Sequence, residues 1–265
     1  DGASSIAVDT ETTATDPLRA DLVGISLAVR EGQGYYIPVG HKTGEPQLPL
    51  EQVVEALRLY LTDPAKPKIG QNLKYDVLAL GLVGLEMEPL GFDTMIAEWL
   101  SNPASRNLGL KDMAEIYLDA HMTHIQELIG RGKAQITMDA VPVARAAPYA
   151  AADAEETLRL VPILEARLGE YNCKKLFEEM EMPLVSVLAE MERTGVALDP
   201  DFFARMSQEI GERMGDIETR VYETVGERFN LNPPQQLSRI LFNVLKLDPP
   251  ARRKKTASGH YSTSA

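Results

Sequence analysis

The first part of the sequence changes its hydrophobic period several times, and this alternation limits the chain to folds that mix strands with helices. Four apolar runs have the length and turn-rich flanks of strands, at 5–8, 22–29, 34–38 and 68–70. Apolar residues recur at helical spacing over 50–61 and again over most of 72–170. The pattern therefore predicts an α/β domain in which a mixed sheet is followed by helices.

Several helix ends can be placed from their capping residues. Asp93 is expected to cap a helix that runs to Leu100, and Asn107 is expected to cap the next one. Pro148 fits the first turn of a helix that runs towards Leu168, because proline lacks the N–H that an interior position needs.

We expect the remaining residues to form a helical arm, without a compact core of their own beyond a helical hairpin. An apolar face covers 177–193, with Pro183 inside it, where we expect a break or kink. The stretch 201–229 carries apolar residues at spacings of four and three, the pattern of a helix packed on a partner helix. We expect two domains, an α/β domain at 1–172 and an all-α helical arm at 173–265.

Composition excludes several classes of protein. Apolar residues make up 44% and charged residues 25%, which are ordinary globular values. No run of about 18 apolar residues exists, so we expect no membrane partner. The net charge of −12 argues against a protein that coats DNA by bulk attraction. Acidic side chains can nevertheless act on phosphates when metal ions lie between them and the substrate.

The remaining compositional features concern cysteine, histidine and the first residue. The single cysteine, Cys173, excludes disulfide frameworks and Cys-rich zinc sites. His121 and His124 have a spacing that could suit a metal, but a polar surface is the better interpretation. The sequence begins with Asp1 and has no basic-then-apolar leader, so we expect a cytoplasmic protein and a piece of a longer chain.

Two carboxylates follow the first apolar run. Asp9 and Glu11 lie two residues apart, which on a strand directs both side chains to the same face. Two carboxylates at such a short distance repel each other, and one of them holds a proton unless a cation lies between them. A charge pair at a strand end in water is the simpler explanation for this pair considered alone.

Two further pairs have helical spacing. Asn72 and Asp76 are four residues apart, as are Tyr149 and Asp153, so each pair shares one helix face. Each alone is also compatible with a helix cap or an exposed charge. Taken together, four acids with no compensating base among them describe a two-metal site for hard cations, and oxygen ligands favour Mg²⁺ or Mn²⁺ over zinc.

This set resembles the three motifs of the tyrosine branch of the DEDD exonuclease superfamily. The segments VDTET, YYIPVGH, GQNLKYD, FDTM and YAAAD resemble the proofreading 3′→5′ exonuclease domain of bacterial family A DNA polymerases. The later segments EMPLVSVLAEMERTGVALD, FNLNPPQQLSRILF and KKTASGHYSTSA resemble the start of the polymerase domain and its thumb helices. The resemblance covers essentially the whole chain.

The resemblance implies a ribonuclease H-like fold and metal-dependent hydrolysis. It implies two divalent ions, Mg²⁺ or Mn²⁺, held by Asp9, Glu11, Asp76 and Asp153. Tyr149 would orient the attacking water and Asn72 would help seat the substrate end. The reaction would release nucleoside 5′-monophosphates from the 3′ end of DNA. Because the chain ends before any polymerase motif, we expect no DNA synthesis from these residues.

The resemblance also suggests DNA contacts. Thr15 and Ile125 stand where the family often has side chains that wedge the terminal bases. The dense basic run is either a solvated loop or a thumb tip that grips duplex phosphates, and it consists of Arg252, Arg253, Lys254 and Lys255. The expected partner is therefore DNA, as a single-stranded 3′ end and as a duplex.

Two other functions stay open at this stage. One is a 3′→5′ exoribonuclease similar to ribonuclease D, whose metal site would be nearly the same. The other is a silent scaffold that binds DNA without catalysis.

Overall fold

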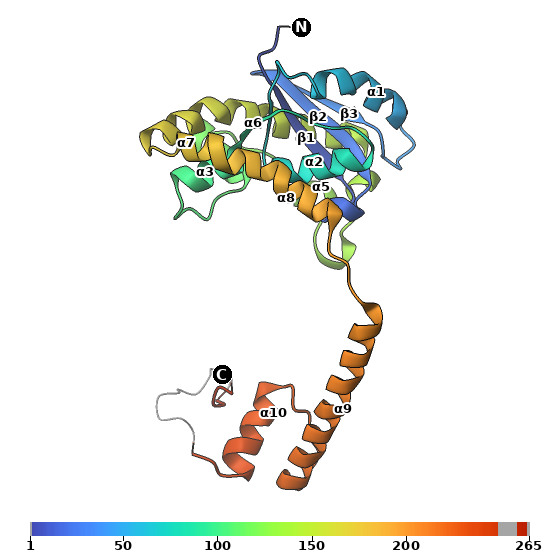
Figure 1. Ribbon diagram of the computed structural model, residues 1–265, viewed down its shortest axis with the longest axis vertical. Coiled ribbons are helices and arrows are strands. Elements are labelled where there is room, and N and C mark those ends of the chain that lie inside the picture. The colour runs from blue at the N-terminus through green and yellow to red at the C-terminus, as the bar shows by residue number, and fades with distance from the viewer. Residues whose placement is uncertain (1, 249–258, 264–265) are drawn as a thin grey trace. The chain divides into compact units, whose positions relative to one another are not determined.

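The computed structural model describes residues 2–248 and 259–263 (Figure 1). They form two compact units, 1–195 and 196–265, which are described separately below. The expected basic run at 252–255 lies outside the described residues. Among the residues described, no helix combines the length and the apolar character that a membrane crossing requires.

A five-stranded mixed sheet organises the first unit. Its strand order is β3-β2-β1-β4-β5, with antiparallel pairing of β1 to β2 and of β2 to β3, and parallel pairing of β1 to β4 and of β4 to β5. The strands are β1 (Ile6–Thr12), β2 (Leu22–Arg30), β3 (Gln33–Pro38), β4 (Lys68–Gly70) and β5 (Leu90–Asp93). The predicted mixed sheet and its meander are confirmed. The fifth strand was not anticipated.

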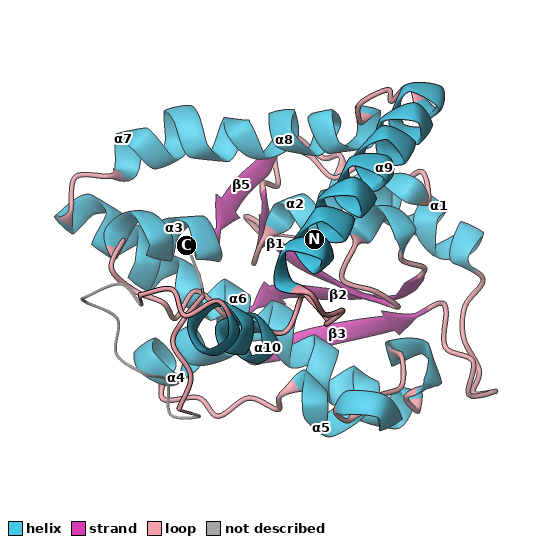
Figure 2. Ribbon diagram, turned by 90° about the horizontal axis from the view of Figure 1, so that it is seen from below, coloured by secondary structure: helices cyan, strands magenta, loops and turns pink. Residues whose placement is uncertain are grey.

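Helices cover this sheet. They are α1 (Leu50–Leu61), α2 (Leu73–Leu82), α3 (Thr94–Ser101), α4 (Leu110–Leu118), α5 (Ile125–Ile129) and α6 (Val143–Glu170). Short 3₁₀ turns occupy Pro17–Arg19, Gly132–Ala134 and Met138–Ala140. The long helix α6 packs across β1, β2 and β3, and α4 packs against α6 (Figure 2). The site described below forms where these elements meet.

Two of the three predicted helix starts are wrong. Asp93 caps α3 as predicted, since its carboxylate accepts from the N–H groups of Met95 and Ile96. Helix α4 begins after Gly109 rather than Asn107, without a side-chain cap. Helix α6 begins at Val143, so Pro148 lies inside the helix instead of in its first turn. Packing across the sheet therefore outweighs the local preference of proline.

The segment after α6 packs with the first unit. It consists of α7 (Lys174–Leu176), a π-helical turn (Phe177–Glu181) and α8 (Met182–Thr194). The π turn comes just before Pro183, where a break was expected. Phe177, Met182 and Val185 are buried in the main core, and α8 packs against α2 and β5. Residues 173–195, which the sequence analysis placed in the second domain, thus share the core of the first unit.

The second unit is helical. It contains α9 (Pro200–Val225), α10 (Pro234–Ser238) and a π-helical segment (Arg239–Val244). The predicted seam on α9 holds in its C-terminal half, where Ile217, Val221 and Val225 line one cavity together with Leu237 and Ile240. Its N-terminal half differs from the prediction, because Ile210 and Met214 are exposed. The structure therefore confirms an α/β unit followed by a helical region.

Candidate metal centre

Three carboxylates converge on one face of the sheet. Strand β1 extends through Asp9 and Glu11, whose backbones pair with Ser26 and Gly24 of β2. Because side chains alternate along a strand, both carboxylates point to the same face. One oxygen from each lies within 4.8 Å of the others and of an oxygen of Asp153 on α6. Glu11 and Asp153 are each 7% exposed. Such a buried oxygen cluster has the chemistry of a divalent-cation site.

A close backbone contact sets the height of α6 over the sheet. A Cβ atom at Gly34 of β3 would lie 2.1 Å from the carbonyl oxygen of Ala151. Real Cβ atoms do not approach a carbonyl so closely, so only glycine permits this packing. Asp153 is two residues further along α6, and its distance from Asp9 and Glu11 depends on this contact.

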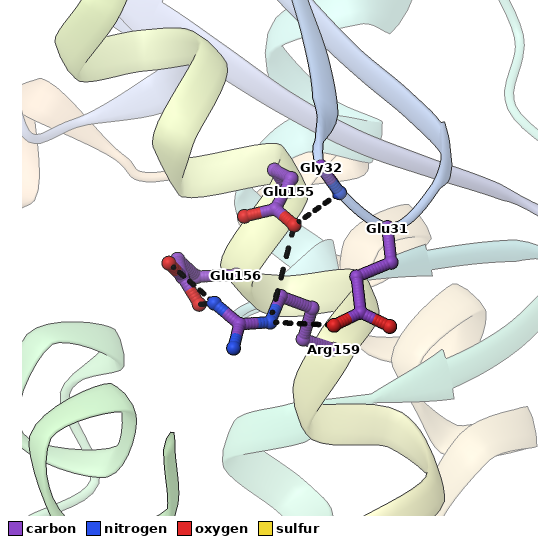
Figure 3. Close-up of polar contacts among 5 residues, drawn as sticks. All are labelled: Glu31, Gly32, Glu155, Glu156 and Arg159. Atoms are coloured by element: carbon purple, nitrogen blue, oxygen red, sulfur yellow. Dashed lines mark hydrogen bonds and ion pairs between the residues drawn. The ribbon is translucent and has the colours of Figure 1, made fainter. Parts of the chain in front are cut away.

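The hairpin between β2 and β3 makes further contacts with α6 (Figure 3). The N–H of Gly32 donates to Oε1 of Glu155 at 2.8 Å. Arg159 lies within ion-pair distance of Glu31 at 3.5 Å and of Glu156 at 2.8 Å. The contacts of Gly32 and Glu31 join the hairpin to α6 within two turns after Asp153.

The acidic cluster holds its protons more tightly than isolated carboxyls. Burial, followed by the charges of Asp76 and Asp153, raises the pKa of Asp9 well above its usual range. Burial, followed by the charge of Asp153, raises the pKa of Glu11 to about 8. Burial also raises the pKa of Asp153. A cation between the carboxylates would reverse these shifts, because it stabilises their charged form.

Asp76 stands beside this cluster rather than inside it. It lies in the first turn of α2 and is 2% exposed, and the hydroxyl of Thr10 donates to its Oδ1 at 2.6 Å. Burial raises the pKa of Asp76 to about 7, and the Thr10 hydrogen bond opposes this shift. Its charge in turn raises the pKa of Asp9. Asp76 is therefore close enough to Asp9 for their charges to interact.

Tyr149 is held against both a carboxylate and a small core. Its hydroxyl hydrogen-bonds to Asp153, four residues along α6, and burial raises its pKa. Its ring belongs to a second cluster of buried residues formed by Val23, Leu128, Met138, Val141, Ala146 and Ala150. The phenol therefore keeps its proton at neutral pH and has a fixed orientation.

Lys111 is the site residue that sequence reasoning missed. Its ammonium group forms an ion pair with Asp153 and lies 4.4 Å from the centroid of the Tyr149 ring. Lys111 is on α4, 42 residues before Asp153, and no spacing rule connects the two positions. The four acids thus have a compensating base after all, brought to them by the packing of α4 on α6.

A cavity of about 750 Å³ opens next to Glu11. Three predicted substrate contacts line it together, Asn72, Thr15 and Ile125. Asn72 has a left-handed backbone with φ of 62°, and its side chain does not cap α2. By contrast, His121 and His124 are both exposed, as expected for a polar surface.

Two family models match the chain. The model described as 3′-5′ exonuclease matches residues 1–169, and the model described as DNA polymerase family A matches residues 200–265. The region 170–199, which contains α7 and α8, lies between the two matches.

Curated relatives match nearly the whole chain. DNA polymerase I of Chloroflexus aurantiacus is 42% identical over 99% of the chain and 28% of the relative. DNA polymerase I of Pseudomonas aeruginosa is 38% identical over 99% of the chain and 29% of the relative. The chain therefore spans less than a third of the length of these relatives.

Solved structures share the fold. The polymerase domain of Pol1 from M. smegmatis, in complex with DNA primer-template and dNTP, superposes with a TM-score of 0.73 and 26% identity, over 98% of this chain and 40% of that one. NrnC of Brucella melitensis with bound Mg²⁺ gives a TM-score of 0.57 at 23% identity, over 73% of this chain and 87% of that one, and shows likeness of fold alone.

Proposed function

The chain belongs to the 3′-5′ exonuclease family, and on that premise we propose that it shortens DNA from the 3′ end by metal-assisted hydrolysis. The observation that carries the proposal is the convergence of oxygens from Asp9, Glu11 and Asp153 within 4.8 Å, with Asp76 beside them. The products would be nucleoside 5′-monophosphates.

The donor set suits two hard divalent ions. Asp9, Glu11 and Asp153 would hold the first ion, and Asp9 together with Asp76 would hold the second. All donors are carboxylate oxygens, which favour Mg²⁺ or Mn²⁺ over zinc. Two such ions supply activation of water and stabilisation of the leaving oxygen.

Tyr149 would position the attacking water. Its raised pKa means that the phenol remains protonated at neutral pH, so it acts as a hydrogen-bonding group rather than as a strong base. The hydrogen bond to Asp153 and the surrounding core keep the hydroxyl close to the carboxylates. A fixed hydroxyl of this kind orients a reactant without an entropic cost at the moment of reaction.

The cavity next to Glu11 would receive the terminal nucleotide. Asn72 offers an amide that can hydrogen-bond to the sugar or phosphate, while Thr15 and Ile125 offer apolar contact to a base. DNA is the proposed substrate because the relatives above carry the name DNA polymerase I. The basic run at 252–255 remains a proposed contact to duplex phosphates.

The decisive experiment follows a 5′-labelled single-stranded DNA incubated with the chain in Mg²⁺, in Mn²⁺ and in EDTA. We expect a ladder that shortens from the 3′ end only when divalent metal is present. Asp76→Asn should slow this shortening by orders of magnitude. It should leave the unfolding temperature nearly unchanged, because the side-chain volume is retained. A rate close to that of the unmodified chain in this variant would refute the two-ion assignment.

The same assay separates the two remaining functions. Faster degradation of an RNA of the same sequence, at the same salt concentration, would favour the ribonuclease D-like function. No degradation by a chain that is folded and binds Mn²⁺ would favour a silent scaffold.

A further inference from the structure

Lys111 reaches the acidic cluster from a helix whose backbone is held firmly in the core. Helix α4 is held in the core by Leu110, Met113 and Ala114, which are 8%, 0% and 0% exposed. The segment before it is tied to the end of β4, because the side-chain amide of Gln71 donates to the carbonyl of Leu108 at 2.8 Å. The backbone of Lys111 is therefore fixed, while its four-carbon side chain can change rotamer without moving the helix.

The ammonium group places a positive charge against the acidic cluster. It contacts Oδ1 of Asp153, with side-chain exposures of 18% for Lys111 and 10% for Asp153. Its charge also acts on Asp9 and Glu11, the other two members of the cluster. Within residues 2–248 and 259–263, no other Lys or Arg forms an ion pair with any of these three carboxylates.

A divalent ion and this ammonium cannot both hold Asp153 in the observed arrangement. An ion such as Mg²⁺ binds carboxylate oxygens at about 2.0–2.1 Å and requires near-octahedral geometry. A positive charge in contact with the same carboxylate would repel the ion in a poorly solvated site, where charges are weakly screened. Entry of the ion therefore requires the ammonium to leave Asp153.

We infer that Lys111 is a built-in competitor for the metal: its ammonium holds Asp153 when no ion is bound and must release it before the ion at Asp9, Glu11 and Asp153 can bind. This inference rests on the metal site of the proposed function. Lys111 would then raise the concentration of divalent metal at which the site becomes occupied. It acts through Asp153 and is thus a positioning residue.

Metal binding tests this directly and needs no DNA. The chain and its variants are titrated with Mn²⁺, and free Mn²⁺ is followed by its electron paramagnetic resonance signal. Lys111→Met removes the charge and keeps the length, so we expect binding of the first ion to tighten by about tenfold or more, the scale of one charge-assisted hydrogen bond. Lys111→Arg keeps the charge and should bind Mn²⁺ within a few-fold of the unmodified chain.

Lys66→Met is the matched control. Lys66 forms an ion pair with Asp63 at 3.2 Å, and its side chain is 21% exposed, close to the 18% of Lys111. Removing its charge should leave the Mn²⁺ affinity unchanged. Lys111→Gln provides a second neutral variant that retains a hydrogen-bond donor to Asp153, and it should also tighten binding if Lys111→Met fails to fold.

The outcomes separate this inference from the proposed function. Equal or weaker Mn²⁺ binding in a folded neutral variant would overturn the competition and leave the nuclease proposal intact. Absence of Mn²⁺ binding by both the unmodified chain and the variants would overturn the metal site and the competition together. A merely structural role of Lys111 would lower the unfolding temperature without tightening the metal affinity.

Discussion

Asp93 caps the helix that begins at Leu73 as well as the helix that it precedes. Its carboxylate accepts the N–H of Leu73 at 2.7 Å and that of Asn72 at 3.2 Å, in addition to those of Met95 and Ile96 at the start of α3. One buried carboxylate thus satisfies the first N–H groups of two helices. Since α2 carries Asp76, the same contacts position part of the metal site.

Replacing Asp93 should therefore affect stability and activity together. Asp93→Ala removes caps from α2 and α3, and we expect a loss of about 2–4 kcal/mol in the free energy of unfolding, at about 1–2 kcal/mol for each cap. Urea unfolding measures this loss, and the 3′-end assay measures the accompanying fall in rate. Asp93→Asn keeps one acceptor oxygen and should lose less. A loss below about 0.5 kcal/mol in Asp93→Ala would show that the shared cap does not stabilise the two helices, since removal of even one cap costs more.

A second prediction follows from the close contact between Gly34 and Ala151. Gly34→Ala places a Cβ against the carbonyl of Ala151, so α6 must move away from the sheet. We expect the hydrolysis rate to fall by at least about tenfold, because displacements of about 1 Å in a catalytic group are costly. Affinity for Mn²⁺ should weaken in parallel.

Gly169→Ala is the control for this substitution. It lies in the same helix, and nothing within 4 Å would meet its Cβ atom. Alanine is the better helix former, so this variant should be neutral or slightly more stable. Equal activity of Gly34→Ala and Gly169→Ala would mean that the height of α6 over the sheet is unimportant for the site.

The raised pKa values predict how stability depends on pH without metal. The pKa of Glu11 is about 8 and that of Asp76 about 7 in the folded chain, above their ordinary values of 4.5 and 3.8. The folded state therefore binds more protons than the unfolded state between about pH 4 and pH 8, and its stability falls as the pH rises through this window. In EDTA, the unfolding temperature should decrease from pH 5 to pH 8.

Metal should remove this dependence. A divalent ion takes the place of the protons between the carboxylates, so saturating Mg²⁺ should raise the unfolding temperature most at pH 8 and least at pH 5. Glu11→Gln should make the profile in EDTA shallower, because one of the titrating side chains is removed. Identical profiles in EDTA and in Mg²⁺ would argue that no ion binds these carboxylates.

Local spacing was a reliable guide to two of the three pairs of site residues. The exception is the pair of Asn72 and Asp76, because Asn72 lies before α2 with a left-handed backbone and is not part of its helical turns. The period of a strand directs Asp9 and Glu11 to one face, and the period of a helix does the same for Tyr149 and Asp153. Local preference was less reliable for helix ends. The structure starts α6 five residues before Pro148 and starts α4 after Gly109, since packing against the sheet stabilises more residues than the preferred end would.

The sequence by itself determined the α/β order of elements, the pairing of Asp9 with Glu11 and of Tyr149 with Asp153, and the resemblance that the family matches confirm. All of these depend on neighbours a few residues apart. Only the tertiary structure decided that α6 lies close enough to β1 to bring Asp153 to Asp9, and that α4 brings Lys111 to the same place. The reason is physical: contacts between distant segments depend on how whole helices pack, and no single spacing in the sequence encodes that packing.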